Sequence, residues 1–112
     1  MTDLLLDGQA LSLVDVIAVA RHGRRVHLGP SARERMAAAQ ALVARIAGGD
    51  RPVYGINTGF GSLSRVRIAP EQTRELQLNL VRSHASAVGE PLPEDVVRAA
   101  LLIGAASLAR GH

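Results

Sequence analysis

Cysteine, lysine and tryptophan are all missing from this chain of 112 residues. Without cysteine there can be no disulfide and no thiolate metal ligand, and nothing in the composition points to an oxidising compartment. No two of the four histidines stand three or four positions apart, so we expect no metal site. The amino terminus lacks the basic and apolar pattern of a signal peptide, and the longest apolar run, residues 99–106, is too short to span a bilayer. We therefore expect a cytoplasmic protein without a membrane partner.

The basic residues carry little sign of a nucleic-acid partner. All 13 are arginine, and they stand against 10 acidic residues, which leaves a net charge of +3. A nucleic-acid-binding domain usually gathers its basic side chains on one face or beside aromatic residues. Here the arginines are scattered and mostly alternate with acids. An unrelated arginine-rich binding protein, which salt-sensitive retention on nucleic acid would reveal, is a minor alternative.

Aromatic residues are nearly absent, and the two that occur, Tyr54 and Phe60, lie in one glycine-rich stretch, PVYGINTGFG. We call this stretch, residues 52–61, the tyrosine loop. Its three glycines allow positive φ angles and close backbone approach, which predicts a shaped loop. A phosphate-binding P-loop would need a lysine after its last glycine, and the dinucleotide fingerprint would need glycine where Ser64 stands. Both of these glycine-loop functions are excluded.

The remaining polar groups of the tyrosine loop are a phenol, an amide and a hydroxyl, from Tyr54, Asn57 and Thr58. Such groups suit a site that works by positioned hydrogen bonds or by proton transfer. The alternative is a structural turn in which the two aromatic rings fill a gap in the core.

The length of the chain allows one domain, over residues 1–112, and the hydrophobic periodicity predicts a mainly α fold. Asp7-Gly8 favours a tight β-hairpin turn between apolar segments at 4–6 and 10–13, and the alternation around Val26 predicts a short strand. Four helices are predicted to begin near Ser12, Ser31, Pro70 and Glu94. Ser12, with Asp15 three residues on, is expected to cap the first helix, and Ser31 and Glu34 have the spacing of a capping box for the second. Glycines at 23 and 48–49 should end these two helices.

The last two predicted helices carry the strongest tertiary signals. In the helix from Pro70 to about Ala87, Leu76, Leu80 and His84 lie four apart, so His84 should point inward with the apolar stripe. The helix from Glu94 to Arg110 is apolar almost all round, which is typical of a helix buried on every side. A domain of this size cannot cover it, and we expect it to pack within a larger bundle, inside a longer chain or between subunits.

Two motifs carry a resemblance to a known family. YGINTGFG, at residues 54–61, and LQLNLVRSHASAVGEP, at residues 76–91, closely resemble the amino-terminal region of the aromatic amino acid ammonia-lyases, above all their histidine-specific branch. The resemblance runs over almost the whole chain. It implies an amino-terminal fragment of a longer helical chain that assembles as a homotetramer and removes ammonia from a small amino acid.

The resemblance also implies roles for individual residues. Tyr54 matches the tyrosine that acts on the β-hydrogen of the substrate, as a base or by positioning it, and Asn57 is expected to contact the substrate. Ser83 and His84 match the pair that recognises the substrate ring. Ser-His is typical of the histidine branch but also occurs in some tyrosine aminomutases. The residues expected to shape the loop are Gly55, Thr58, Gly59, Phe60 and Gly61.

The implied reaction is the conversion of L-histidine to urocanate and ammonia, for which the family uses an electrophile, 4-methylideneimidazol-5-one. This group forms from an internal Ala-Ser-Gly tripeptide, and the chain contains none. We therefore expect the isolated chain to be inactive. Two alternatives follow: a non-catalytic helical module that assembles with full-length relatives, and a fragment of a tyrosine aminomutase.

Overall fold

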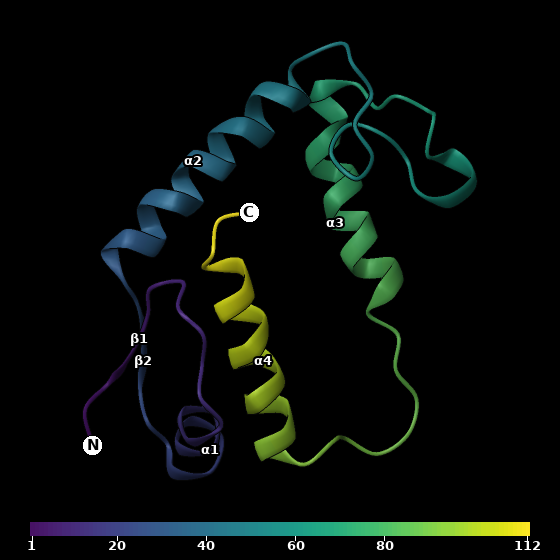
Figure 1. Ribbon diagram of the computed structural model, residues 1–112. Coiled ribbons are helices and arrows are strands. Elements are labelled where there is room, and N and C mark those ends of the chain that lie inside the picture. Colours follow the sequence, from purple (N-terminus) through teal and green to yellow (C-terminus); the bar gives the residue numbers. More distant parts are fainter. The chain divides into compact units, whose positions relative to one another are not determined.

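The computed structural model describes all residues, 1–112, and the mainly helical prediction is confirmed (Figure 1). The elements in chain order are β1 (Leu4–Leu6), α1 (Leu13–His22), β2 (Val26–Leu28), α2 (Pro30–Ala47), two short 3-10 turns (Gly61–Leu63 and Pro70–Gln72), α3 (Thr73–His84) and α4 (Glu94–Leu108). The chain divides into two compact units. The first unit comprises Met1–Ala39 and Glu90–His112, and the second unit comprises Gln40–Gly89.

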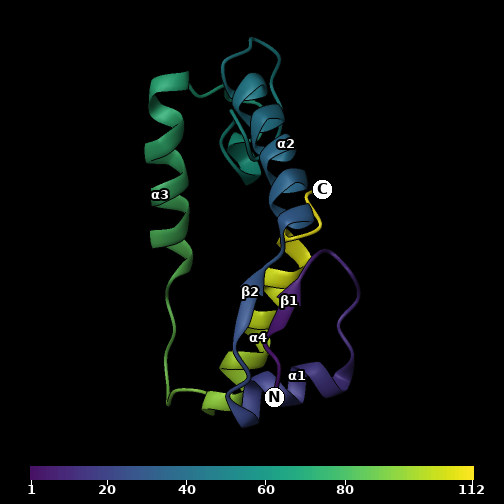
Figure 2. The ribbon, with the colours of Figure 1, turned by 90° about the vertical axis from the view of Figure 1, so that its left-hand side faces the viewer.

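The first unit contains a two-stranded parallel sheet in which Leu4 pairs with Val26 and Leu6 with Leu28 (Figure 2). The strand predicted around Val26 is confirmed, but the hairpin at Asp7-Gly8 is wrong. Gly8 does adopt a positive φ of 88°, yet the chain then runs on into α1 and not into a second strand. Parallel strands need a crossover connection, and α1 supplies it.

The core of the first unit joins β1 to three helices. Its buried members are Leu4, Leu6, Val19, Ala32, Leu102 and Ala109. α1 packs directly on α4, and a hydrogen bond of 3.1 Å from Nη2 of Arg98 to the carbonyl oxygen of Val19 fastens the two helices together. Burial of these apolar side chains stabilises the packing of β1, α1, α2 and α4 against one another.

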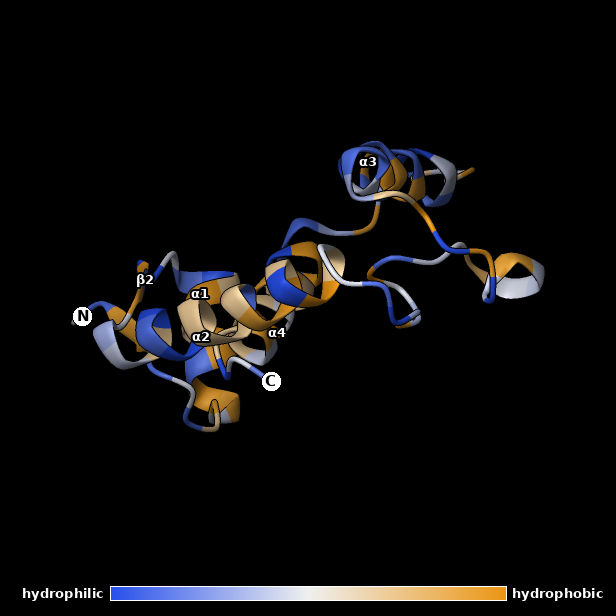
Figure 3. Ribbon diagram, turned by 90° about the horizontal axis from the view of Figure 1, so that it is seen from above, coloured by the Kyte–Doolittle hydropathy of each residue, from blue (hydrophilic) through white to orange (hydrophobic).

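Most of α4 consists of apolar residues, and Figure 3 colours each residue of the chain by its hydropathy. The helix begins at Glu94 as predicted, ends at Leu108, and buries only Leu102 fully. Leu101 and Leu108 are 69% and 72% exposed. The expectation that this helix packs inside a larger bundle therefore stays a prediction. None of the helices combines the length and the apolar character needed to cross a membrane.

The ends of the first two helices test the predicted caps. Ser12 caps α1 as predicted and forms a capping box with Asp15, and Gly23 ends that helix with a φ of 68°. The capping box predicted at Ser31 is wrong, because Pro30 already occupies the first helical position and places Ser31 within the first turn. The Ser31 hydroxyl instead lies 3.5 Å from the carbonyl oxygen of Asp7. α2 ends at Ala47, just before the predicted pair of glycines.

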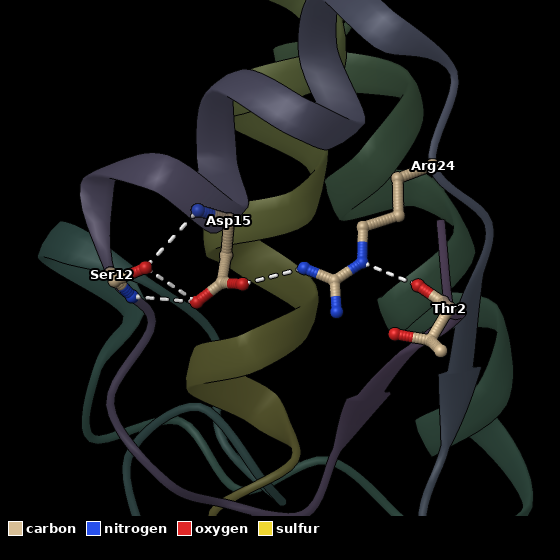
Figure 4. Close-up of polar contacts among 4 residues, drawn as sticks. All are labelled: Thr2, Ser12, Asp15 and Arg24. Carbon is tan, nitrogen blue, oxygen red and sulfur yellow. Dashed lines mark hydrogen bonds and ion pairs between the residues drawn. The ribbon is translucent and has the colours of Figure 1, made fainter.

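Asp15 also ties the amino terminus to α1 (Figure 4). Its Oδ1 accepts a bond of 2.6 Å from Nη1 of Arg24, whose Nε donates to the carbonyl oxygen of Thr2 at 2.8 Å. The hydrogen bond from the Ser12 hydroxyl does most to hold the pKa of the Asp15 carboxyl below its ordinary value. The backbone amide of Ser12 and the guanidinium of Arg24 lower this pKa further. The ionised carboxylate is thus the form that the fold favours.

This network predicts a loss of stability in acid. Because the pKa of Asp15 is lower in the folded chain than in the unfolded chain, its contribution is complete above about pH 4 and disappears as the pH falls through the folded value. In Asp15→Asn, the urea midpoint followed by helical circular dichroism should change less between about pH 6 and pH 2 than in the parent chain. If the urea midpoint changed equally with pH in both proteins, ionised Asp15 would not be a source of the stability.

Candidate functional site

The tyrosine loop lies in the second unit and is closed by backbone hydrogen bonds. The amide of Gly59 donates to the carbonyl oxygen of Val66 at 3.0 Å, and the amide of Ile68 donates to the carbonyl oxygen of Asn57 at 2.7 Å. Between these bonds Thr58 forms an antiparallel bridge with Arg67. The returning segment, residues 66–68, therefore runs alongside the loop and fixes its shape.

Asn57 lies at the centre of this loop, with none of its surface exposed. Its Oδ1 accepts a bond of 2.7 Å from the Val53 amide, and its Nδ2 donates to the carbonyl oxygens of Arg51 and Ile46 at 3.0 and 3.3 Å. Every bond of the amide side chain in the structure goes to backbone. A contact between Asn57 and the substrate stays a prediction, while its contacts here shape the loop.

Thr58 is the second buried polar residue of the loop, at 1% exposure. Its Oγ1 donates to the carbonyl oxygen of Gly59 at 2.9 Å and accepts a longer bond of 3.4 Å from the amide of Gly55. The hydroxyl thus bonds to backbone on both sides of it, and no buried side-chain polar atom lacks a partner.

Tyr54 differs from these two residues because its side chain is 62% exposed. Its ring meets that of Phe60 edge to face, with 5.7 Å between the centroids and 80° between the planes. The two aromatic residues of the chain therefore contact each other. Tyr54 does not fill a core gap, so the purely structural alternative fails for its ring.

Two glycines of the loop are required for different physical reasons. A Cβ on Gly59 would lie 2.6 Å from Cβ of Leu63 and 2.8 Å from its carbonyl oxygen, whereas a Cβ on Gly61 would meet nothing within 4 Å. Gly61 instead has a φ of 58°, which an L residue adopts only at a cost.

These differences predict which of two glycine substitutions destabilises the loop more. Gly61→Ala should destabilise the loop by about 1 to 2 kcal/mol through backbone strain alone. Gly59→Ala should cost more, since the Leu63 backbone must move, and should expose the amides of Gly59 and Ile68 to exchange. Hydrogen exchange at Ile68 measures both effects. Faster exchange in Gly61→Ala than in Gly59→Ala would contradict the close-contact argument.

Arg67, which the sequence analysis did not single out, anchors the returning segment. Its Nη2 donates to the carbonyl oxygen of Gly49 at 2.6 Å and lies 3.3 Å from Oδ1 of Asp50. The tyrosine loop is thereby fixed to the turn that follows α2. No sequence signal distinguishes this arginine from the other scattered ones.

Gln77, also missed, joins α3 to the loop. Its Nε2 donates to the carbonyl oxygen of Gly55 at 3.0 Å. The helix that carries Ser83 and His84 is therefore bonded directly to the residue that follows Tyr54. The only signal for Gln77 in the sequence was its place near the start of the second motif.

The prediction that His84 points inward is wrong. Leu76 and Leu80 are half-buried, but His84 is exposed, and α3 has no fully buried residue. α3 also ends at His84, earlier than the predicted Ala87, because Ala85 leaves the helical region with ψ at 56°. The first turn differs too, since Pro70–Gln72 is a 3-10 turn and the α-helix begins at Thr73.

Ser83 and His84 share one backbone oxygen. Ser83 Oγ donates to the carbonyl oxygen of Leu80 at 2.9 Å, and Nδ1 of His84 lies 2.9 Å from the same oxygen and 3.0 Å from Ser83 Oγ. The other ring nitrogen, Nε2, makes none of these bonds. No three histidine, aspartate or glutamate side chains gather to hold a metal ion.

Comparison with known proteins places this arrangement in a family. The family described as aromatic amino acid lyase matches residues 11–112. Histidine ammonia-lyase of Symbiobacterium thermophilum is 57% identical over 105 residues, which are 94% of this chain and 21% of that protein. The chain thus spans about a fifth of the length of the curated relatives it matches.

Two solved structures have the same fold over nearly the whole chain. Ergothionase of Treponema denticola, an ergothioneine-degrading enzyme, superposes with a TM-score of 0.93 at 34% identity, over 98% of this chain and 22% of that one. Tyrosine aminomutase of Streptomyces globisporus gives 0.92 at 31% identity, over 99% and 21%. These matches confirm the resemblance carried by the two motifs: the chain belongs to the aromatic amino acid lyase family.

Proposed function

We propose that this chain supplies the tyrosine loop and the ring-recognition helix of a histidine ammonia-lyase, which converts L-histidine to urocanate and ammonia. The identity of 57% to a histidine ammonia-lyase supports this substrate. In this proposal residues 1–112 act as one amino-terminal domain of a cytoplasmic homo-oligomer, and further residues complete the site.

The observation that carries the proposal is the contrast within the tyrosine loop. Asn57 and Thr58 are buried and bonded to backbone, whereas Tyr54 projects with most of its side chain exposed. A group that transfers a proton must be held in place and must still be reachable by the substrate. The loop meets both needs at Tyr54 Oη, which we assign to removing the β-proton.

The second part of the proposal concerns α3. The bond from Gln77 to the carbonyl oxygen of Gly55 holds this helix against the loop, and the exposed pair Ser83 and His84 lies at its carboxyl end. We assign the pair to recognition of the substrate ring and Gln77 to positioning the loop relative to the helix.

In this proposal the family's electrophile, 4-methylideneimidazol-5-one, comes from outside residues 1–112, since these contain no Ala-Ser-Gly tripeptide. The chemistry assigned to the chain is therefore limited to holding the substrate and moving its β-proton.

A chimera tests the proposal. This chain replaces the matching residues of the Symbiobacterium thermophilum histidine ammonia-lyase, and urocanate formation from L-histidine is measured by absorbance. The chimera should be active, and the isolated chain should give no urocanate. A chimera that folds and assembles like the parent enzyme but does not release urocanate would sink the proposal.

A tyrosine aminomutase is the second candidate, favoured by the TM-score of 0.92 to the Streptomyces globisporus enzyme. It would differ in its substrate and in adding ammonia back to the product. Offering the chimera L-tyrosine and analysing for a β-amino acid distinguishes the two.

A non-catalytic module, suggested by the exposed apolar residues of α4, would instead co-purify with a larger lyase without changing its substrate.

A further inference from the structure

The carboxyl end of α3 holds a triangle of three polar atoms. Ser83 Oγ, His84 Nδ1 and the carbonyl oxygen of Leu80 lie 2.9 to 3.0 Å from one another. All three distances are within the hydrogen-bonding range. Only two protons, that of the hydroxyl and one on Nδ1, are available to fill the triangle.

The carbonyl oxygen decides where these protons lie, because it can only accept. If Nδ1 of His84 were unprotonated, its lone pair would face the lone pairs of the Leu80 oxygen at 2.9 Å. With the proton on Nδ1, both Nδ1 and Ser83 Oγ donate to that oxygen, and Oγ can also accept from Nδ1. Of the two neutral tautomers of the ring, the arrangement therefore favours the one that is protonated at Nδ1.

The proton on Nδ1 determines what the rest of the ring offers. A neutral imidazole has one donor and one acceptor nitrogen, so Nε2 becomes the acceptor. His84 is exposed, and its Nε2 is free of the triangle. The acceptor can then meet a donor group from outside the chain.

We propose that Ser83 is a positioning residue that, together with the Leu80 carbonyl, holds His84 in the Nδ1-protonated form and so makes Nε2 a hydrogen-bond acceptor. Its ligand is a ring that carries an N–H or O–H donor, such as an imidazole or a phenol. This choice of ligand rests on the proposed function. The protonation state of His84 rests only on the geometry of α3.

Nitrogen NMR of the 112-residue chain tests the protonation state directly. Long-range proton–nitrogen spectra at about pH 8.5, where an ordinary imidazole is neutral, report which ring nitrogen carries the proton. His84 should be protonated mainly at Nδ1. Ser83→Ala should lower the ratio of Nδ1-protonated to Nε2-protonated ring by roughly 2- to 10-fold, the effect of one lost hydrogen bond.

Ser83→Thr is the matched control, since a threonine hydroxyl in a helix can bond to a carbonyl oxygen three or four residues earlier. It should restore the ratio, while the spectrum of His22 on α1 should be the same in all three proteins. A His84 protonated mainly at Nε2 would overturn the proposal, and an unchanged ratio in Ser83→Ala would remove Ser83 from it. Neither result depends on activity, so a failure here is distinct from an inactive chimera.

Discussion

Tyr54→Phe in the active chimera should lower kcat for urocanate formation by about 10²- to 10⁴-fold, the usual contribution of a positioned acid or base. The substitution removes only the phenol oxygen. The remaining ring keeps its edge-to-face contact with Phe60, and its exposure leaves no buried cavity. The loss should therefore appear in the rate of the chemical step and hardly in the stability of the protein.

The control for this variant separates chemistry from loop shape. Thermal unfolding of Tyr54→Phe should match that of the unmodified chimera. Phe60→Leu, which removes the aromatic contact and keeps the phenol, should reduce kcat far less and should lower stability by about 0.5 to 1.5 kcal/mol. If Tyr54→Phe keeps more than about a tenth of the rate, Tyr54 is not the base.

Asn57→Ala should give the largest loss of stability in the second unit, about 2 to 3 kcal/mol. The substitution removes three hydrogen bonds of a fully buried side chain, one from the Val53 amide and two to the carbonyl oxygens of Arg51 and Ile46. Because 1.4 kcal/mol corresponds to a factor of ten, protection of the Ile68 amide against hydrogen exchange should fall roughly 30- to 150-fold. Measuring the exchange at Ile68 reports on the loop itself, since this amide donates to Asn57.

Asn79→Ala is the matched control, because it makes the same chemical change at an exposed position of α3. Surface substitutions of this kind usually change stability by less than about 0.5 kcal/mol. Equal exchange rates in the two variants would show that the bonds of Asn57 do not hold the loop. The first unit, which shares none of these bonds, should keep its amide protection in both.

Local signals predicted the elements well where one residue type fixes the backbone. The capping pair Ser12 and Asp15, the αL residue Gly23 and the glycines after Ala47 set helix ends through contacts within a few residues. The loop glycines were recognisable for the same reason. Ser31 failed because two valid signals competed, and proline at the first helical position took precedence over the capping box.

Long-range partners were not predictable in the same way. Nothing near Asp7-Gly8 shows that Leu4–Leu6 pairs with Val26–Leu28, since the pairing depends on α1 bringing two distant segments together. The stripe of Leu76, Leu80 and His84 gives a helix face but not what covers it. For that reason the orientation of His84 was wrong even though its helix was right.

The sequence by itself determined the mainly helical composition, the position of the tyrosine loop and, through two motifs, the family. These depend on backbone conformation and on residue identity along the chain. Only the tertiary structure decided that Asn57 is buried while Tyr54 is exposed, and that Arg67 and Gln77 hold the loop. Burial and hydrogen-bond partners depend on segments meeting in space, and side chains of the same type are indistinguishable until that packing is known.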